Sequence, residues 1–178
     1  AIYLSLNNLS IGEQHDITEL WFLLFDKISD EINIIIPKIE YKREFENLDL
    51  NDALIYSKAD YIINKLNNSK TSKWLNNTQG TIINTITCNN CNYLSYNFEP
   101  FIAIQLDLPN NDLNSISLTK LFRNYLKTIV NKDEWKCDKC NKCTEYTKNI
   151  KLWKLPNVLI FLLKRYNNLT IKNTLPVD

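Results

Sequence analysis

The stretch GTIINTITCNNCNYL, residues 80–94, sets the architecture of this chain. Its first half alternates and is rich in β-branched side chains, which predicts a strand over residues 81–87. That strand leads directly into Cys88 and Cys91, the first of two C-x-x-C pairs. A C-x-x-C turn places two sulfur atoms on one side of a tight bend. The stretch therefore predicts a strand that ends in half of a metal site.

The second pair, Cys137 and Cys140, follows the first after 45 intervening residues. Two such turns supply four thiolates in a tetrahedron, which suits Zn²⁺ with Zn–S bonds of about 2.3 Å, and a site closed by four protein ligands is structural. We therefore predict structural zinc held by Cys88, Cys91, Cys137 and Cys140. Four metal-free thiols are the alternative; a redox C-x-x-C is disfavoured, because no βαβ pattern lies beside either pair.

A fifth cysteine, Cys143, extends the second pair to C-x-x-C-x-x-C. A shift of register could therefore exchange one ligand for another, and we assign Cys137 and Cys140 as ligands with Cys143 as a spare thiol. Five cysteines, an odd number, without a recognisable secretory leader indicate thiols or metal ligands rather than disulfides. This usage favours an intracellular protein, cytoplasmic or nuclear.

Helices are predicted on both sides of the first C-x-x-C pair. Residues 16–32 carry an apolar stripe at helical spacing, with Asp16 as N-cap and Glu19 as its capping-box partner. A second helix is plausible over residues 49–66, before an Asn-Asn-Ser breaker. Ser117 is placed to cap a third helix over residues 118–130.

The remaining segments read as strands. Residues 93–108 predict two strands broken at Pro100, residues 144–155 an extended segment, and residues 157–166 a central strand buried on both faces. Trp135 and Trp153 are expected to pack rather than to contact a ligand.

Composition excludes several classes of function. The chain of 178 residues is 44% hydrophobic and 23% charged, which is typical of a folded domain. A net charge of +1 disfavours a zinc ribbon that binds nucleic acid. No apolar run reaches the roughly 18 residues that span a bilayer, so no membrane partner is expected.

Three further blocks appear in a fixed order around the cysteine pairs: GEQHDITEL at 12–20, EPFIAIQLDLP at 99–109 and LPNVLIFLLKRY at 155–166. Together with the pairs they resemble the motifs of ubiquitin-specific cysteine proteases, over about residues 12–177. The resemblance implies one α+β domain with part of a papain-like right-hand fold. Helical thumb and palm elements would occupy residues 1–79, a zinc-tipped antiparallel finger ribbon 80–155, and palm strands 156–178.

The resemblance also implies a function. This family hydrolyses ubiquitin conjugates after the C-terminal glycine of ubiquitin, using a Cys nucleophile and a His base. Its nucleophile box lies upstream of these motifs and its His box downstream, so no catalytic residue maps onto this chain. The only histidine, His15, lies inside the first block and is a poor candidate for a base.

The chain is therefore expected to be an internal recognition and scaffold segment of a thiol-dependent deubiquitinase. The alternative is a catalytically dead pseudoenzyme that binds ubiquitin. By resemblance, Gln14, Asp16 and Glu19 would lie at the ubiquitin-binding cleft, with the two carboxylates meeting the basic tail of ubiquitin. For Asp16 this role competes with capping the helix.

Overall fold

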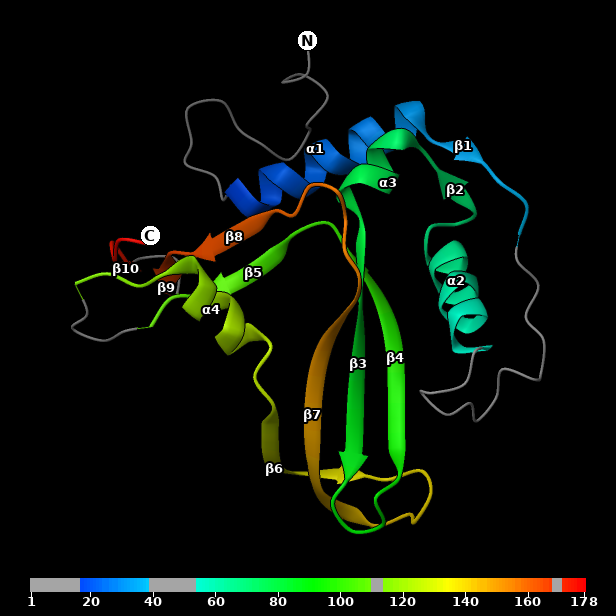
Figure 1. The fold of residues 1–178 in the computed structure, drawn as a ribbon, viewed down its shortest axis with the longest axis vertical. Coiled ribbons are helices and arrows are strands. Elements are labelled where there is room, and N and C mark those ends of the chain that lie inside the picture. The colour runs from blue at the N-terminus through cyan, green and yellow to red at the C-terminus, as the bar shows by residue number, and fades with distance from the viewer. Residues whose placement is uncertain (1–16, 39–53, 110–113, 168–170) are drawn as a thin grey trace.

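The computed structural model describes residues 17–38, 54–109, 114–167 and 171–178 (Figure 1). The helices are α1 (Ile17–Ile32), α2 (Leu54–Leu66), α3 (Lys73–Thr78) and α4 (Leu118–Tyr125). The strands are β1 (Ile34–Ile35), β2 (Lys70–Thr71), β3 (Gly80–Cys88), β4 (Leu94–Phe101), β5 (Ile104–Asp107), β6 (Ile129–Lys136), β7 (Cys143–Lys154), β8 (Phe161–Lys164), β9 (Tyr166–Asn167) and β10 (Ile171–Lys172). Helices and mainly antiparallel strands make this an α+β fold, as predicted.

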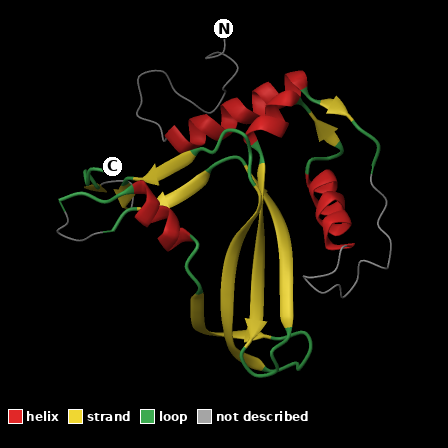
Figure 2. Ribbon diagram, in the orientation of Figure 1, coloured by secondary structure: helices red, strands yellow, loops and turns green. Residues whose placement is uncertain are grey.

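The dominant element is a four-stranded antiparallel sheet of order β4-β3-β7-β6, which we call the finger sheet. Its long strands run down the molecule, and both C-x-x-C turns lie at its far end (Figures 1 and 2). The central strand β3 pairs with β4 from Gly80↔Phe101 to Thr87↔Leu94, and with β7 along its other edge. The strands predicted over residues 81–87 and 144–155 are confirmed.

One face of the finger sheet is covered by α2. Side chains alternate between the faces of a strand, so Ile83 and Phe98 point toward α2 and pack against Ile55 and Ala59. Trp153 closes this cluster edge-on to Phe98, with ring centroids 5.0 Å apart. The packing role expected for Trp153 is confirmed.

A second core lies beside the base of the finger sheet. Strands β5 and β8 pair in parallel, from Ile104↔Phe161 to Asp107↔Lys164, and we call them the palm pair. Helix α4 packs against it through Leu121, and Leu175 of the C-terminal segment completes the buried cluster. The two cores share none of their buried residues.

Side-chain hydrogen bonds fasten the C-terminal segment to the palm pair. Arg165 donates from Nη1 to the carbonyls of Asn173 at 3.2 Å and Leu175 at 3.0 Å. Asn173 in turn donates from Nδ2 to the carbonyl of Pro109 at 3.0 Å. Arg165 thus has a structural task that its sequence context did not reveal.

The predicted break at Pro100 is wrong. Strand β4 continues through Pro100, which pairs with Thr81, and the chain leaves the sheet only after Phe101. Because β4 lies at the edge of the finger sheet, the missing N–H of proline can be accommodated there.

The helix predicted over residues 118–130 is too long. Helix α4 ends at Tyr125, and Ile129 already pairs with Lys148 as the first residue of β6. Ile129 and Val130 are β-branched, which favours the strand over the helix.

The fully buried central strand predicted over residues 157–166 is also wrong. Strand β8 has only four residues, of which three are half-buried, and Val158 before it is 52% exposed. Within the part of the chain that the structure describes, β8 pairs only with β5. A strand that pairs along only one edge is less buried than a central strand, which has a neighbouring strand on each side.

Helix α1 is confirmed over its described residues and packs on α3 through aromatic rings. Trp74 of α3 lies 6.2 Å from Trp21 and 5.7 Å from Phe25, measured between ring centroids. The second predicted helix is present from Leu54 onward, and its predicted start at residues 49–53 lies outside the described residues.

Candidate metal centre

The structure brings the four predicted cysteines together at the tip of the finger sheet. The Sγ atoms of Cys88 and Cys140 are 3.9 Å apart, and those of Cys91 and Cys137 are 3.7 Å apart. All four sulfur atoms lie within 4.8 Å of one another. Ligands at about 2.3 Å in a tetrahedron are separated by about 3.8 Å, so this set fits a Zn²⁺ ion.

Burial differs among the four sulfur ligands. Cys88 and Cys137 are fully buried, whereas Cys91 and Cys140 are partly exposed. Cys143 is exposed and lies outside the set of four. It begins β7 opposite Lys136 instead.

The first C-x-x-C turn is built by backbone hydrogen bonds. Cys88 donates its N–H to the carbonyl of Tyr93 at 2.9 Å, and Asn92 donates to the carbonyl of Cys88 at 2.9 Å. Closing the turn requires Asn92 to adopt a φ of 56°, a left-handed conformation that asparagine tolerates better than most residues.

The second turn repeats the first. Cys137 donates to the carbonyl of Lys142 at 3.0 Å, and Asn141 donates to that of Cys137 at 2.8 Å. Asn141 has a φ of 55°, nearly that of Asn92. These two asparagines were missed as site residues, although the same residue follows both C-x-x-C pairs in the sequence.

Hydrogen bonds within the two turns lower the pKa of Cys140 and of Cys88. Hydrogen bonding from the backbone of Lys142, opposed by burial, lowers the pKa of Cys140 to about 7. Burial raises the pKa of Cys88, but bonds from the backbone of Cys91 and Asn90 outweigh it and lower that pKa overall.

The pKa of Cys91, the other partly exposed thiol, is shifted in the opposite direction. The backbone of Tyr93 lowers the pKa of Cys91, but burial and the three surrounding cysteines outweigh it and raise the pKa to about 12. The pKa is thus lowered at two of the sulfur atoms and raised at a third. Thiol ligands bind a metal as thiolates, so a divalent cation at this site would displace the proton of Cys91.

The residues expected to meet ubiquitin are only partly placed by the structure. Glu19 lies exposed in the first turn of α1. Gln14 and Asp16 lie outside the described residues, as does His15. Their relation to Glu19 stays a prediction.

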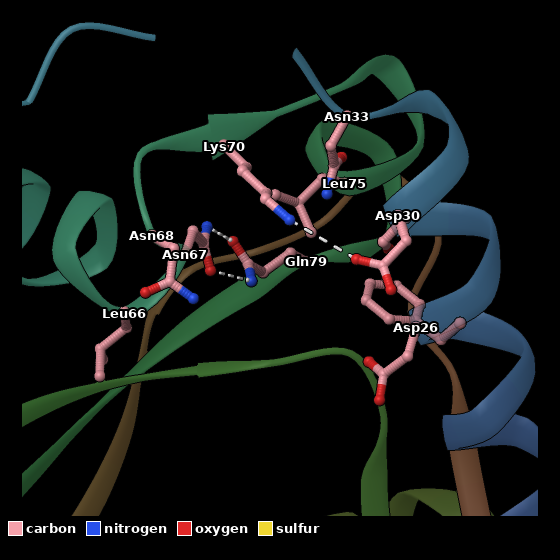
Figure 3. A pocket seen from close by; sticks show the side chains of 11 residues that line it. Asp26, Asp30, Asn33, Leu66, Asn67, Asn68, Lys70, Leu75 and Gln79 are labelled. Carbon is pink, nitrogen blue, oxygen red and sulfur yellow. Dashed lines mark hydrogen bonds and ion pairs between the residues drawn. The ribbon is translucent and has the colours of Figure 1, made fainter. Parts of the chain in front are cut away.

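A separate pocket of about 440 Å³ lies between α1, the turn after α2, and α3 (Figure 3). Asn67 and Gln79 exchange two amide hydrogen bonds across it, at 2.7 and 3.0 Å, and Lys70 pairs with Asp30 at 3.5 Å. No cysteine or histidine is among its described lining residues.

No helix in the described part of the chain is both long enough and apolar enough to cross a bilayer.

A long antiparallel sheet carries four cysteines at its tip that could hold a metal ion, and it is joined at its base to the palm pair and helices. This combination defines an α+β class of protein. The family model described as ubiquitin carboxyl-terminal hydrolase matches residues 2–177. The chain belongs to this family.

Individual relatives agree with that assignment. Ubiquitin carboxyl-terminal hydrolase 4 of Saccharomyces cerevisiae (strain ATCC 204508 / S288c) is 32% identical over 98 residues, 53% of this chain and 11% of that protein. Ubiquitin carboxyl-terminal hydrolase 2 of Gallus gallus is 26% identical over 162 residues, 89% of this chain and 44% of that protein. The chain thus spans less than half the length of either relative.

A solved structure shows the same fold. It is the SAGA Ubp8/Sgf11/Sus1/Sgf73 DUB module bound to ubiquitin aldehyde, matched with a TM-score of 0.63 and 18% sequence identity. The match covers 99% of this chain and 33% of the solved chain. The right-hand-like α+β fold expected from the sequence motifs is confirmed.

Proposed function

We propose that this chain is the ubiquitin-recognition and scaffold segment of a cysteine-type deubiquitinase, a thiol protease that hydrolyses ubiquitin conjugates after the C-terminal glycine. The observation that carries the proposal is the family match over residues 2–177 on a fold that includes the complete four-cysteine tip. A protein of the same fold was solved with ubiquitin aldehyde, which supports ubiquitin as the partner. An intracellular setting, cytoplasmic or nuclear, belongs to the same proposal.

The proposal includes structural Zn²⁺ held by Cys88, Cys91, Cys137 and Cys140. When bound, the ion supplies cross-linking and no reaction chemistry, because four protein ligands leave no open coordination position. The four cysteines come from the turn between β3 and β4 and from the turn between β6 and β7, and their sulfur atoms lie within 4.8 Å of one another.

The face of the finger sheet opposite α2 is a suitable surface for a protein partner. It carries Asn84, Asn97, Glu99 and Lys148 around a hollow of about 230 Å³. The amide, carboxylate and ammonium groups around this hollow can donate and accept hydrogen bonds, which supports contact with polar groups of another molecule here.

Catalytic residues are not assigned to this segment. Four of its cysteines form the metal centre, and Cys143 is exposed at the start of β7. This distribution favours a nucleophile elsewhere in the polypeptide, and it equally suits the second candidate, a pseudoenzyme that binds ubiquitin without cleaving it. Treating the whole polypeptide with ubiquitin propargylamide separates the two. Covalent labelling supports the deubiquitinase, whereas binding without labelling supports the pseudoenzyme.

Ubiquitin binding by the chain is tested with charge reversals on α1. We expect Glu19→Lys, and Asp16→Lys before it, each to weaken binding of the zinc-loaded chain to ¹⁵N-labelled ubiquitin by about fivefold, because charge-assisted bonds to a basic tail are lost. Glu31→Lys, a charge reversal at another exposed residue near the other end of α1, is the matched control and is expected to bind as the unmodified chain does.

Equal affinities for the unmodified chain and both reversals would remove the tail contact from the proposal. If the zinc-loaded chain itself caused no shifts in the ubiquitin spectrum, the recognition role would be contradicted.

A further inference from the structure

The two residues inside the first C-x-x-C turn have different partners. Asn89 faces the sheet: its N–H donates to the carbonyl of Glu145 at 3.2 Å, and its Oδ1 accepts from the Thr147 hydroxyl at 3.0 Å. Asn90 faces the other turn, and its Nδ2 lies 3.7 Å from the Sγ of Cys140. One asparagine therefore fastens the turn to β7, while the other reaches a sulfur atom of the metal centre.

A contact of 3.7 Å between an amide nitrogen and sulfur is a hydrogen bond, since sulfur is a large acceptor. Such bonds strengthen when the acceptor carries charge, as a thiolate does. Donors outside the ligand sphere orient metal ligands, and removing them typically weakens metal binding about 10–100-fold.

The hydrogen bond from Asn90 matters for metal retention because its acceptor, the Sγ of Cys140, is partly exposed. Cys140 is one of the two partly exposed cysteines, whereas Cys88 and Cys137 are fully buried. An exposed ligand is the one that water and competing chelators reach first. A second contact crosses the tip in the opposite direction, with Lys139 Nζ 5.7 Å from the ring centroid of Tyr93.

We propose that Asn90 is a positioning residue of the metal centre. Its side-chain amide donates to the Cys140 thiolate, disperses part of the negative charge and holds this exposed ligand in the tetrahedron, which slows zinc loss. The inference rests on the zinc site proposed above, and it concerns a residue that is not itself a ligand.

The test compares Asn90→Ala with Asn90→Asp in the whole chain. Alanine removes the donor, and we expect zinc affinity, measured by competition with a chromophoric chelator, to fall about tenfold. Aspartate keeps the shape of asparagine but places a carboxylate beside the thiolate, so we expect a larger fall and faster zinc transfer to EDTA. Both variants should also shift the thiolate-to-metal charge-transfer band of the Co²⁺-loaded chain.

Asn76→Ala, at an exposed asparagine of α3 away from the tip, is the control and is expected to match the unmodified chain in all three measurements. The inference is overturned if Asn90→Asp retains the affinity, transfer rate and Co²⁺ spectrum of the unmodified chain, because a space-filling role would tolerate that substitution. If the unmodified chain binds no stoichiometric zinc, the zinc site itself fails, which is a distinguishable result.

Discussion

Asn92 and Asn141 hold backbone angles that most side chains avoid, and each closes one of the two C-x-x-C turns. The left-handed conformation costs an ordinary L-residue about 1–2 kcal/mol. Asparagine reduces this penalty and glycine abolishes it. The candidate metal centre therefore depends on two residues outside the four cysteines.

We expect Asn92→Val to destabilise the zinc-loaded chain by about 1–2 kcal/mol, because a β-branched residue is poorly accommodated at a φ of 56°. Denaturant unfolding with excess zinc measures the change. Asn92→Gly is the companion variant and should be as stable as the unmodified chain or slightly more so. Equal stability of the valine and glycine variants would contradict a backbone role.

Single residues also show where sequence reasoning reaches its limit. The four cysteines could be chosen from their spacing, because C-x-x-C is a local motif with a local geometry. The contact of Asn90 with Cys140 could not, because it joins residues 50 positions apart in the chain. The task of Arg165 was missed for a similar reason, since its acceptors lie on a separate segment after β10.

Among the secondary-structure elements, α4 shows how local signals position a helix. Ser117 is its N-cap, with the side-chain oxygen accepting from the N–H of Lys120 at 3.3 Å. The cap was apparent in the sequence. The end of the helix was not, because β6 begins where Ile129 finds its partner on β7. Pairing between distant strands overrode the helical pattern.

We expect Ser117→Ala to destabilise the chain by about 1 kcal/mol, since the N–H of Lys120 loses its capping acceptor. Ser117→Asp should retain the cap and hence most of the stability. Thermal unfolding of the three chains at one zinc concentration measures the difference. A loss as large for aspartate as for alanine would show that the hydroxyl acts in some other way.

At the scale of the molecule, the buried residues form two separate hydrophobic cores. One joins α2 to the finger sheet and the other joins α4 to the palm pair, with no buried residue in common. The metal centre lies at the far end of the finger sheet from the palm pair (Figure 1). Loss of the metal should therefore act first on the tip.

We expect Cys88→Ser to lose bound zinc and to raise hydrogen exchange in residues 86–94 and 135–146, because metal binding is coupled to the folding of its ligand turns. Residues 104–108 and 161–164 of the palm core should keep their protection. Mass spectrometry with zinc analysis of the same samples provides both measurements. The chelator EDTA should reproduce the pattern in the unmodified chain and add nothing to the variant.

Uniform loss of protection along the whole chain would instead indicate one cooperative unit. Full zinc content in Cys88→Ser would remove this residue from the ligand set.

The two C-x-x-C turns leave the ribosome one after the other, so the four cysteines become available for metal binding at different times. Cys137 follows Cys91 by 46 positions. At about 5–20 residues per second, synthesis of that interval takes about 2–9 s. During this time the hairpin of β3 and β4 can form by itself, but its two thiols have no partners. Capture of a metal by four ligands must wait until Cys140 has emerged. Strand β7 follows, and it can join β3 from Tyr146 at the tip toward Lys154 at the base. In the nascent chain, a metal can therefore close the far end of the finger sheet before the base of β7 has been synthesised.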